Sequence, residues 1–530
     1  MESLSETPWD ITISGTGLPQ SLLALALSRS GKKILHVDKN RLYGGTEAAF
    51  SLQEAEEWVN KLKQEPGTAP FEDVSIYVSP EHVKVLSFSR AYTLSLSPHL
   101  VYSRSKLLPC LVSSKVYRQL EFQPVGSWWI YKSPNATRTS ELIAEGDASA
   151  CLHRVPNSRE DIFADLSIPV KSKRALIKFL RHIAQPLQQD VNNTPIDLED
   201  DLDLSFAEYL ISRFQVPSEL HDPLLSLSLA PVSPQQTLAS FAVPRIKRHL
   251  GSIGVFGRGF GSVLTKWGGG SEISQVGCRA LAVGGGVYVL NRGIQSIDTK
   301  VDLQKGGPLQ LQLSDGEVIR TRFIVGSHWD LPPNAQIPQP ACHKVARSIN
   351  IVSSSLAGLF PVMYDGGPTP TGVVVVVPGT ELTHDQGSAH VPSTYLLVHS
   401  SETGECPAGQ CIIYGMVSLP GSKGQSLIEE ALNKLLRTFT DADGTPAVLW
   451  SLRYTQLGLP CGAGYSEGNP FASPISDRII CFQPSNLDIA FDDGMIDAVK
   501  AVWKRLSGDD TRDEEFMNFE DRAGVFSDDE

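Results

Sequence analysis

The sequence predicts a mixed α/β protein: a multi-segment domain built on a Rossmann-type βαβ unit, with β-rich portions and a smaller all-helical domain inserted into it. Three observations predict this architecture. Strand, glycine turn, helix and strand signals follow one another at the start; residues 154–245 place apolar side chains at helical spacing; and glycine-rich turns and strands return from residue 251. At 530 residues and 41% apolar content, the chain can bury a substantial core.

The βαβ unit occupies residues 10–38. Residues 10–14 (DITIS) form a short apolar run typical of a strand, the Gly-Thr-Gly of residues 15–17 predicts a tight turn, residues 21–29 predict a helix, and residues 33–38 (KILHVD) predict the second strand. His36 lies inside that second strand, where a core residue with a satisfied hydrogen bond is expected rather than a catalytic base.

The glycine turn carries most of a dinucleotide-binding pattern. In such a site the first Gly makes the turn, the second lets the pyrophosphate approach, the third allows close helix packing, and an acidic residue about 20 positions on binds the ribose. Gly15, Gly17 and Asp38 fit this pattern, but the third position is Gln20, whose long side chain narrows the space for a pyrophosphate. The pattern therefore favours an inherited fold with a degenerate site over a working cofactor site.

A second departure follows at the end of the βαβ unit. Flavin enzymes of the amine oxidase type commonly have Gly-Gly-Arg there, and the arginine meets the cofactor phosphates. Here Gly44 and Gly45 are followed by Thr46. We therefore expect no cofactor.

The helical segment begins near Arg154. Asn157 and Glu160 resemble a capping box, and residues 205–208 (SFAE) match that pattern outright. Apolar residues at helical spacing follow, at positions 176, 177, 180, 183 and 184 and again at 206, 210 and 214. Such stripes are usually core, with a ligand-holding groove as the alternative.

The second half of the chain predicts helices over residues 272–282, 427–439 and 495–506, and strands over 287–290, 373–377 and 479–481. A hairpin over 309–313 and 318–325, ending in Gly-Ser, is also typical of the FAD-binding fold. The predicted domains are thus residues 1–153 with 246–507, the helical insert 154–245, and a tail 508–530.

Charge is unevenly distributed. The chain has 46 basic and 59 acidic residues, a net charge of −13 that argues against general affinity for nucleic acid or anionic membranes. The tail holds ten carboxylates and predicts a solvated, flexible end. Neither a signal peptide nor a spanning segment is evident, which favours the cytoplasm, and no catalytic or metal-binding motif emerges.

Three blocks resemble one known superfamily, that of Rab GDP dissociation inhibitors and Rab escort proteins. The first, DITISGTGLPQSLLALALSRSGKKILHVDKNRLYGG, has that superfamily's Gly-Thr-Gly, Gly-Lys-Lys and Tyr-Gly-Gly at matching spacings. Residues 271–291 (SEISQVGCRALAVGGGVYVLN) are similar to a second block, and residues 99–122 (HLVYSRSKLLPCLVSSKVYRQLEF) to a third. Ser274 and Gly284 depart from the superfamily's Pro and aromatic residue in the second block.

The resemblance implies a Rab-binding surface at Tyr43, Glu272, Arg279 and Val289. Glu272 and Arg279 are seven residues apart, so a helix would present both on one face. The resemblance also implies that the helical insert holds geranylgeranyl groups, through residues that the sequence does not identify.

The LWSLRY segment (449–454) and the acidic tail resemble the escort branch. That branch has no active site of its own. Its partners are GDP-form Rab GTPases before and after prenylation and the Rab geranylgeranyl transferase α/β heterodimer, with only transient membrane contact. Two alternatives stay open: a Rab GDP dissociation inhibitor that recycles prenylated Rabs, and an FAD-dependent, amine-oxidase-like oxidoreductase.

Overall fold

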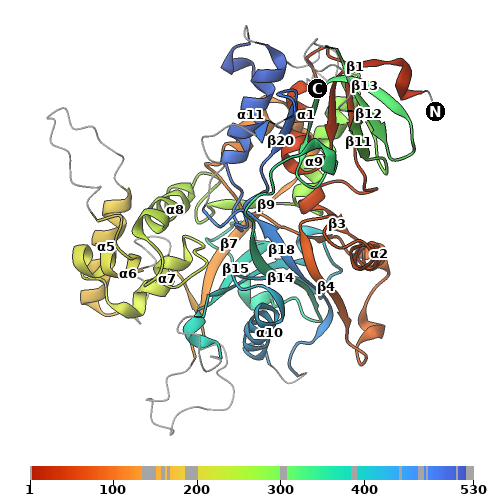
Figure 1. Ribbon diagram of the computed structural model, residues 1–530. Helices are drawn as coiled ribbons and strands as arrows, with labels where there is room; N and C mark the ends of the chain where they lie inside the picture. Colours follow the sequence, from red (N-terminus) through yellow and green to blue (C-terminus); the bar gives the residue numbers. More distant parts are fainter. Residues whose placement is uncertain are drawn as a thin grey trace, which may run out of the picture.

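The computed structural model describes residues 3–133, 151–156, 162–163, 168–184, 201–298, 307–383, 391–440, 444–462, 471–472, 475–508 and 511–520. Two large sheets form the body of the molecule, and helices α5 to α8 form a lobe at its side (Figure 1). The predicted fold class is confirmed.

The first sheet has eight strands in the order β10-β2-β1-β13-β12-β11, with β20 on β13 and β19 on β20. Strands β10, β2, β1, β13 and β20 run parallel, and β12 turns back antiparallel on β13. The strands are β1 (Pro8–Ser14), β2 (Ile34–Val37), β10 (Val287–Val289), β11 (Ile294–Asp298), β12 (Leu309–Leu313), β13 (Val318–Ser327), β19 (Phe471–Ala472) and β20 (Ile479–Phe482). The predicted βαβ unit and hairpin are both present.

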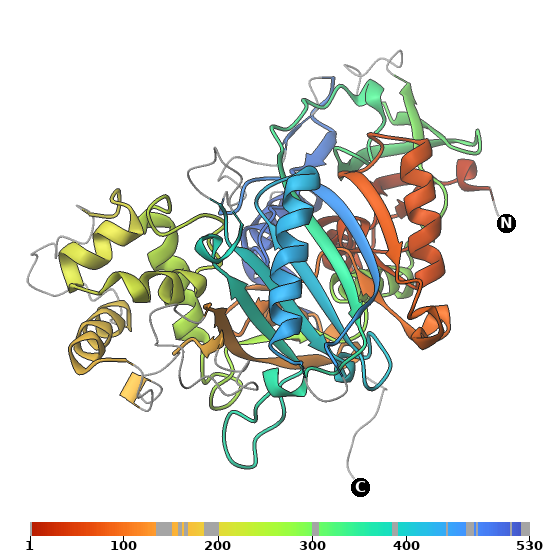
Figure 2. The ribbon, with the colours of Figure 1, turned by 90° about the horizontal axis from the view of Figure 1, so that it is seen from below.

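The second sheet has ten strands in the order β4-β18-β14-β17-β16-β15-β7-β9-β6, with β8 on β7. They are β4 (Phe71–Val78), β6 (Val101–Tyr102), β7 (Phe122–Tyr131), β8 (Leu152–Arg154), β9 (Ser262–Thr265), β14 (His343–Val352), β15 (Gly372–Val377), β16 (Thr394–Ser400), β17 (Cys411–Val417) and β18 (Val448–Gly458). Helix α10 (Gly421–Arg437) lies across one face of this sheet (Figure 2) and begins six residues before the predicted start at 427. A two-stranded ribbon, β3 (Ala49–Phe50) with β5 (Leu94–Ser95), adds to the body.

Helices around the first sheet explain why it holds together. All ten residues of α1 (Leu18–Leu27) are buried, because α9 (Gly270–Val283) and α11 (Gly494–Ser507) pack against it. The amphipathic helix α2 (Leu52–Gln64) begins with a capping box at Ser51 and packs on β4. The short helix α3 (Leu107–Ser113) contributes Leu107 and Leu111 to the core around α1.

The side lobe contains α5 (Val170–Ala184), α6 (Phe206–Tyr209), a π-helical turn (Leu210–Phe214), α7 (His221–Ser226) and α8 (Ala239–Ser252). The Ser205 and Glu208 capping box is confirmed, whereas Asn157 and Glu160 lie outside the described residues. The predicted apolar stripes form core, because Leu176, Leu180 and Ile183 are buried in one cluster with Phe206, Leu210 and Phe214. Phe179, which was not predicted, contacts Phe206 and Phe214 edge to face. The lobe lies between β8 and β9 in the chain, and its exact domain boundaries stay a prediction.

One buried ion pair joins the lobe to the body. Arg245 of α8 makes a two-pronged contact with Asp488, at 3.1 and 2.6 Å, and Asp488 is only 4% exposed in its side chain. Burial and this partner act in opposite directions on the pKa of Arg245, and the net effect raises it. Breaking such a pair would leave a buried charge without compensation.

Part of the predicted flexible tail is packed against the body. Met517 is fully buried, Phe516 contacts Trp503 of α11, and the N–H of Phe519 donates to the carbonyl of Ser113. Asp513 pairs with two lysines of α11. The sequence suggested a solvated end because the tail has many more carboxylates than aromatic residues, although a few apolar and aromatic side chains anchor this segment.

In the described residues, no helix combines the length and apolar character needed to cross a bilayer.

Candidate functional site

The glycine turn after β1 is closed from within by an aspartate. Gly15 has a φ of +87°, and a Cβ at this position would lie 2.2 Å from Oδ2 of Asp330. Asp330 follows β13, the strand beside β1, so the ends of two adjacent parallel strands bring it to the turn. The carboxylate therefore occupies the space through which a pyrophosphate would approach the glycine backbone.

Gln20 completes this closure. Its Nε2 donates to Asp330 Oδ2 over 3.0 Å, and its Oε1 lies 2.8 Å from the point that a Cβ on Gly17 would take. Gln20 is 1% exposed. The predicted narrowing at Gln20 is thus present, and the larger contribution comes from Asp330, which no local pattern places beside a turn 315 residues earlier in the chain.

Asp38 is held in the same buried environment. Thr16 Oγ1 donates to one carboxylate oxygen over 2.6 Å, and the Asn40 N–H donates to the other over 2.7 Å. Burial, together with the negative charge of Asp330, raises the pKa of Asp38 to about 6. Burial also raises the pKa of Asp330.

These residues do not fit a dinucleotide. The carboxylates of buried Asp38 and half-buried Asp330 would repel a diphosphate, both oxygens of Asp38 already accept hydrogen bonds, and the approach to Gly15 is filled. His36 is a core residue as predicted: its Nε2 lies 2.6 Å from the Gly15 carbonyl, and burial lowers its pKa to about 4.

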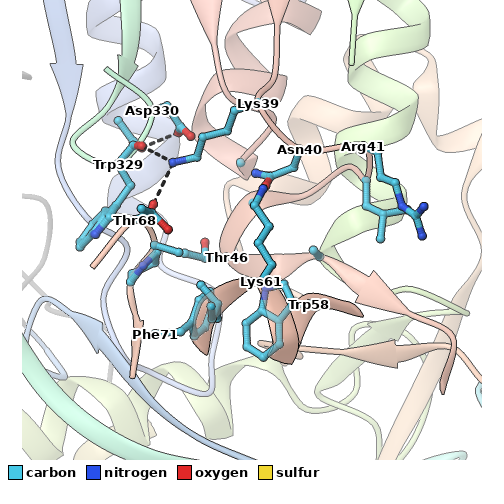
Figure 3. Close-up of a pocket in the computed structure, with 18 of the residues that line it drawn as sticks. Lys39, Asn40, Arg41, Thr46, Trp58, Lys61, Thr68, Phe71, Trp329 and Asp330 are labelled. Carbon is cyan, nitrogen blue, oxygen red and sulfur yellow. Dashed lines mark hydrogen bonds between the residues drawn. The ribbon is translucent and has the colours of Figure 1, made fainter. Parts of the chain in front are cut away.

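A cavity of about 540 Å³ opens beyond the filled turn (Figure 3). Its walls come from the loops that follow β1, β2, β13 and β20, together with α2 and the start of β4. Thr46, at the position where flavin enzymes have arginine, lines this cavity.

The residues predicted for partner binding are not among those that line this cavity. Tyr43 stacks on Tyr288 with ring centroids 5.4 Å apart and an interplanar angle of 1°. The charge of nearby Arg279 partly offsets the burial that raises the pKa of Tyr43. Val289 follows Tyr288 in β10, which pairs with β2 through Val37. The fold thus brings Tyr43, Arg279 and Val289 to one edge of the first sheet.

Helix α9 explains why Glu272 and Arg279 point away from the core. Cβ atoms added at Gly277 and Gly284 would lie 2.5 and 1.8 Å from the carbonyl oxygens of Ser21 and Ser28, so this face of α9 lies directly against α1. Each of these two charged residues comes two positions after a glycine of this face, Glu272 after Gly270 and Arg279 after Gly277. Two positions correspond to a rotation of about 200° around the helix axis. Both charged residues therefore occupy the opposite face.

The glycine contact also explains a departure from the family pattern. Gly284 replaces an aromatic residue in that pattern, and the carbonyl of Ser28 leaves no room there for any side chain. Arg279 is exposed, whereas Glu272 is only partly exposed and burial raises its pKa. The aromatic partner Tyr288 was missed in the sequence, although it lies inside the recognised block. No observation tests the binding roles of the four predicted residues, which stay a prediction.

The fold is of the FAD-binding type, and the position that a dinucleotide takes in such a fold is filled here by the side chains of Gln20 and Asp330. The chain belongs to the GDP dissociation inhibitor (GDI) family, whose model matches residues 5–358. It is 28% identical to a Saccharomyces cerevisiae protein named Rab proteins geranylgeranyltransferase component A, over 80% of this chain and 64% of that protein. It is 23% identical to the Rab GDP dissociation inhibitor beta of Canis lupus familiaris, over 60% of this chain and 62% of that protein. The chain thus spans just under two thirds of the length of these relatives.

Solved structures show the same fold. A crystal structure of Rab GDI from Plasmodium falciparum matches with a TM-score of 0.63 at 18% identity, covering 94% of this chain and 98% of that one. A Methanosarcina mazei oxidoreductase matches with a TM-score of 0.54 at 12% identity, covering 93% and 99%. The fold is therefore shared between Rab-binding proteins and oxidoreductases.

Proposed function

We propose that this chain is a non-catalytic Rab escort protein. It binds newly made Rab GTPases in the GDP form, presents them to the Rab geranylgeranyl transferase heterodimer, and carries the prenylated product through the cytoplasm to a membrane. The observation that carries this proposal is the identity of 28% over 80% of the chain with a relative named as component A of the transferase.

The α9 face and the adjacent strand edge support a Rab-binding surface. Tyr43 and Tyr288 form a rigid aromatic pair beside the exposed guanidinium of Arg279, and aromatic residues with arginine are the side chains that dominate protein interfaces. Glu272, two helical turns before Arg279, and Val289 extend the same surface. In this role Arg279 forms charge-assisted hydrogen bonds with the GTPase.

The helical lobe supports the lipid-carrying step. A geranylgeranyl group has 20 carbons, and its exposure to water costs on the order of 15 kcal/mol at about 0.8 kcal/mol per buried CH₂. A groove between helices of the lobe would cover it. The escort contributes orientation and local concentration, while the transferase carries out the chemistry.

The alternative, a Rab GDP dissociation inhibitor, has weaker support. Relatives named component A match over about 430 residues at 26–28% identity, whereas the inhibitor from dog matches 332 residues at 23%. The oxidoreductase alternative conflicts with the filled glycine turn.

The decisive experiment measures geranylgeranylation of a purified Rab by the transferase heterodimer with and without this protein. We expect modification to rise from near zero to completion when the protein is added. Extraction of prenylated Rab from membranes without any stimulation would instead identify a dissociation inhibitor, and tightly bound FAD in the same preparation would identify an oxidoreductase.

Arg279→Glu should abolish the stimulation. Arg437 is an exposed arginine at the end of α10, on the second sheet; Arg437→Glu is therefore the matched control and should leave the stimulation unchanged.

A further inference from the structure

The cavity beyond the glycine turn lies where the fold places ligands. Its walls include Gly17 after β1 and Ser327 after β13, the two neighbouring parallel strands between which the chain order of the first sheet reverses. Open parallel sheets bind ligands at such switch points. The volume of about 540 Å³ is within the range of small-molecule sites.

One wall of the cavity is made of aromatic side chains that pack against one another. Trp58 lines it, and the indole packs against Phe50, Phe71 and Tyr454 with ring centroids 5.5, 5.2 and 6.1 Å apart. Phe71 and Trp329 also line the cavity. Aromatic side chains fixed in this way form a prepared surface for stacking a flat ring.

The cations at the cavity already have partners. Lys39 donates to the carbonyls of Thr68 and Trp329 (Figure 3), Arg41 pairs with Glu57, and Lys61 donates to Asn40 over 3.3 Å. Of these three cations, Arg41 meets a carboxylate, whereas Lys39 and Lys61 donate to neutral oxygens and keep their charge. Further carboxylates line the same cavity and balance the two lysines, namely Glu54, Glu65 and Asp330. The cavity therefore offers little attraction for an anion.

The inner end of the cavity rejects phosphate. Gln20 and Asp330 both line it there, and they occupy the space beside Gly15 and Gly17 where a phosphate group would meet the backbone. A carboxylate at this point opposes a bound anion. The inner end of the cavity is thus filled against phosphate, whereas the part lined by Trp58, Phe71 and Trp329 stays open.

We propose that this cavity binds an uncharged, planar heteroaromatic molecule of two or three fused rings, stacked near Trp58 and lacking phosphate groups. The site is separate from the surface of Tyr43 and Arg279, and the inference does not depend on the proposed escort function. The ligand is a bound molecule rather than a redox cofactor.

Riboflavin, FMN and FAD provide a matched test, because they share one ring system and differ in phosphate content. Each is titrated with the full-length protein while its fluorescence polarisation is followed. We expect saturable one-to-one binding of riboflavin, at least tenfold weaker binding of FMN, and weaker binding still of FAD. No saturable binding of riboflavin, or binding of FAD as tight as that of riboflavin, would overturn the proposal.

Three variants locate the site. Thr46→Trp fills the cavity from its rim and should weaken riboflavin binding at least tenfold. Asp330→Asn should reduce the preference for riboflavin over FMN at least threefold. Val318→Thr, on an exposed part of β13, is the control and should bind like the parent. Circular dichroism checks folding of each variant, and undiminished riboflavin binding by folded Thr46→Trp would refute the assigned cavity.

Discussion

Two regions around the βαβ unit differ in whether they leave room for a ligand: the glycine turn is filled, and the edge at β10 is open. At the glycine turn, Gln20 and Asp330 fill the space that a dinucleotide uses in this fold; Gln20 is buried and Asp330 is half-buried. At the other side, Tyr43 and Arg279 remain accessible beside β10. The comparison teaches that two side chains are enough to fill the dinucleotide position of this fold, while a neighbouring edge built from the same strands keeps an aromatic and a charged side chain at the surface.

Reversing the charge on the open side should have the largest effect. Arg279→Glu should weaken Rab binding by about 3 kcal/mol or more, roughly 100-fold, because it replaces an attractive charge at the centre of the proposed interface. Isothermal titration calorimetry with GDP-loaded Rab measures this. Arg437→Glu serves as control, and an unchanged affinity for Arg279→Glu would place the interface elsewhere.

Disturbing the close contact between α1 and α9, the helices that lie between the two regions, should destabilise the protein. Gly277→Ala introduces a Cβ 2.5 Å from the Ser21 carbonyl, so the helices must separate. We expect a loss of about 2 kcal/mol in the free energy of unfolding, measured with urea. Gly307→Ala, where nothing lies within 4 Å of the added Cβ, should have little effect. Equal stability of the two variants would contradict the close helix contact.

The filled side should respond to pH. The pKa of Asp38 is raised in the folded state to about 6, so its contribution to stability is present below pH 4 and is lost as the pH rises through 6. Between pH 4 and pH 7 the ionisation of Asp38 should lower the free energy of unfolding by on the order of 1–2 kcal/mol. Asp38→Asn cannot ionise and should not show this decrease. Urea titrations of both proteins at several pH values measure it. Parallel pH profiles would show that Asp38 titrates normally.

The smallest effect should come from the hydroxyl of Tyr43. Tyr43→Phe keeps the stack on Tyr288 and should change stability by less than about 0.5 kcal/mol, whereas Tyr43→Ala removes the stack and should cost about 1 kcal/mol. Thermal unfolding of both variants separates the two contributions. If Phe and Ala cost the same, the hydroxyl and not the ring stabilises this edge.

Local patterns predicted the elements well. The helical spacing over 272–282 and the alternation in the hairpin correspond to α9, β12 and β13, because helix and strand periodicity are properties of neighbouring residues. The glycine turn also predicted the degenerate site through Gln20. Residues 511–520 were predicted only as part of an acidic tail, since composition does not show that Met517 finds a core.

Contacts between distant segments could not be predicted in this way. Asp330 meets Gly15 because β13 pairs with β1, and that pairing depends on the whole sheet. Likewise, Gly284 looked like a departure from a family pattern until the carbonyl of Ser28 was seen against it. Such residues are specified by tertiary packing, which a single sequence does not show.

The strand order of the first sheet also bears on how the chain folds. Strand β1 is synthesised long before its neighbour β13, which lies more than 300 residues later in the chain, and β20 joins the sheet only at residues 479–482. Pairing over such sequence separations is slow, because a long loop must close before the contacts form. Until then the apolar surfaces of β1 and α1 stay uncovered on the growing chain. In the proposed role this protein would cover the lipid of another protein. During its own synthesis, however, its strand β1 and helix α1 themselves need protection from aggregation.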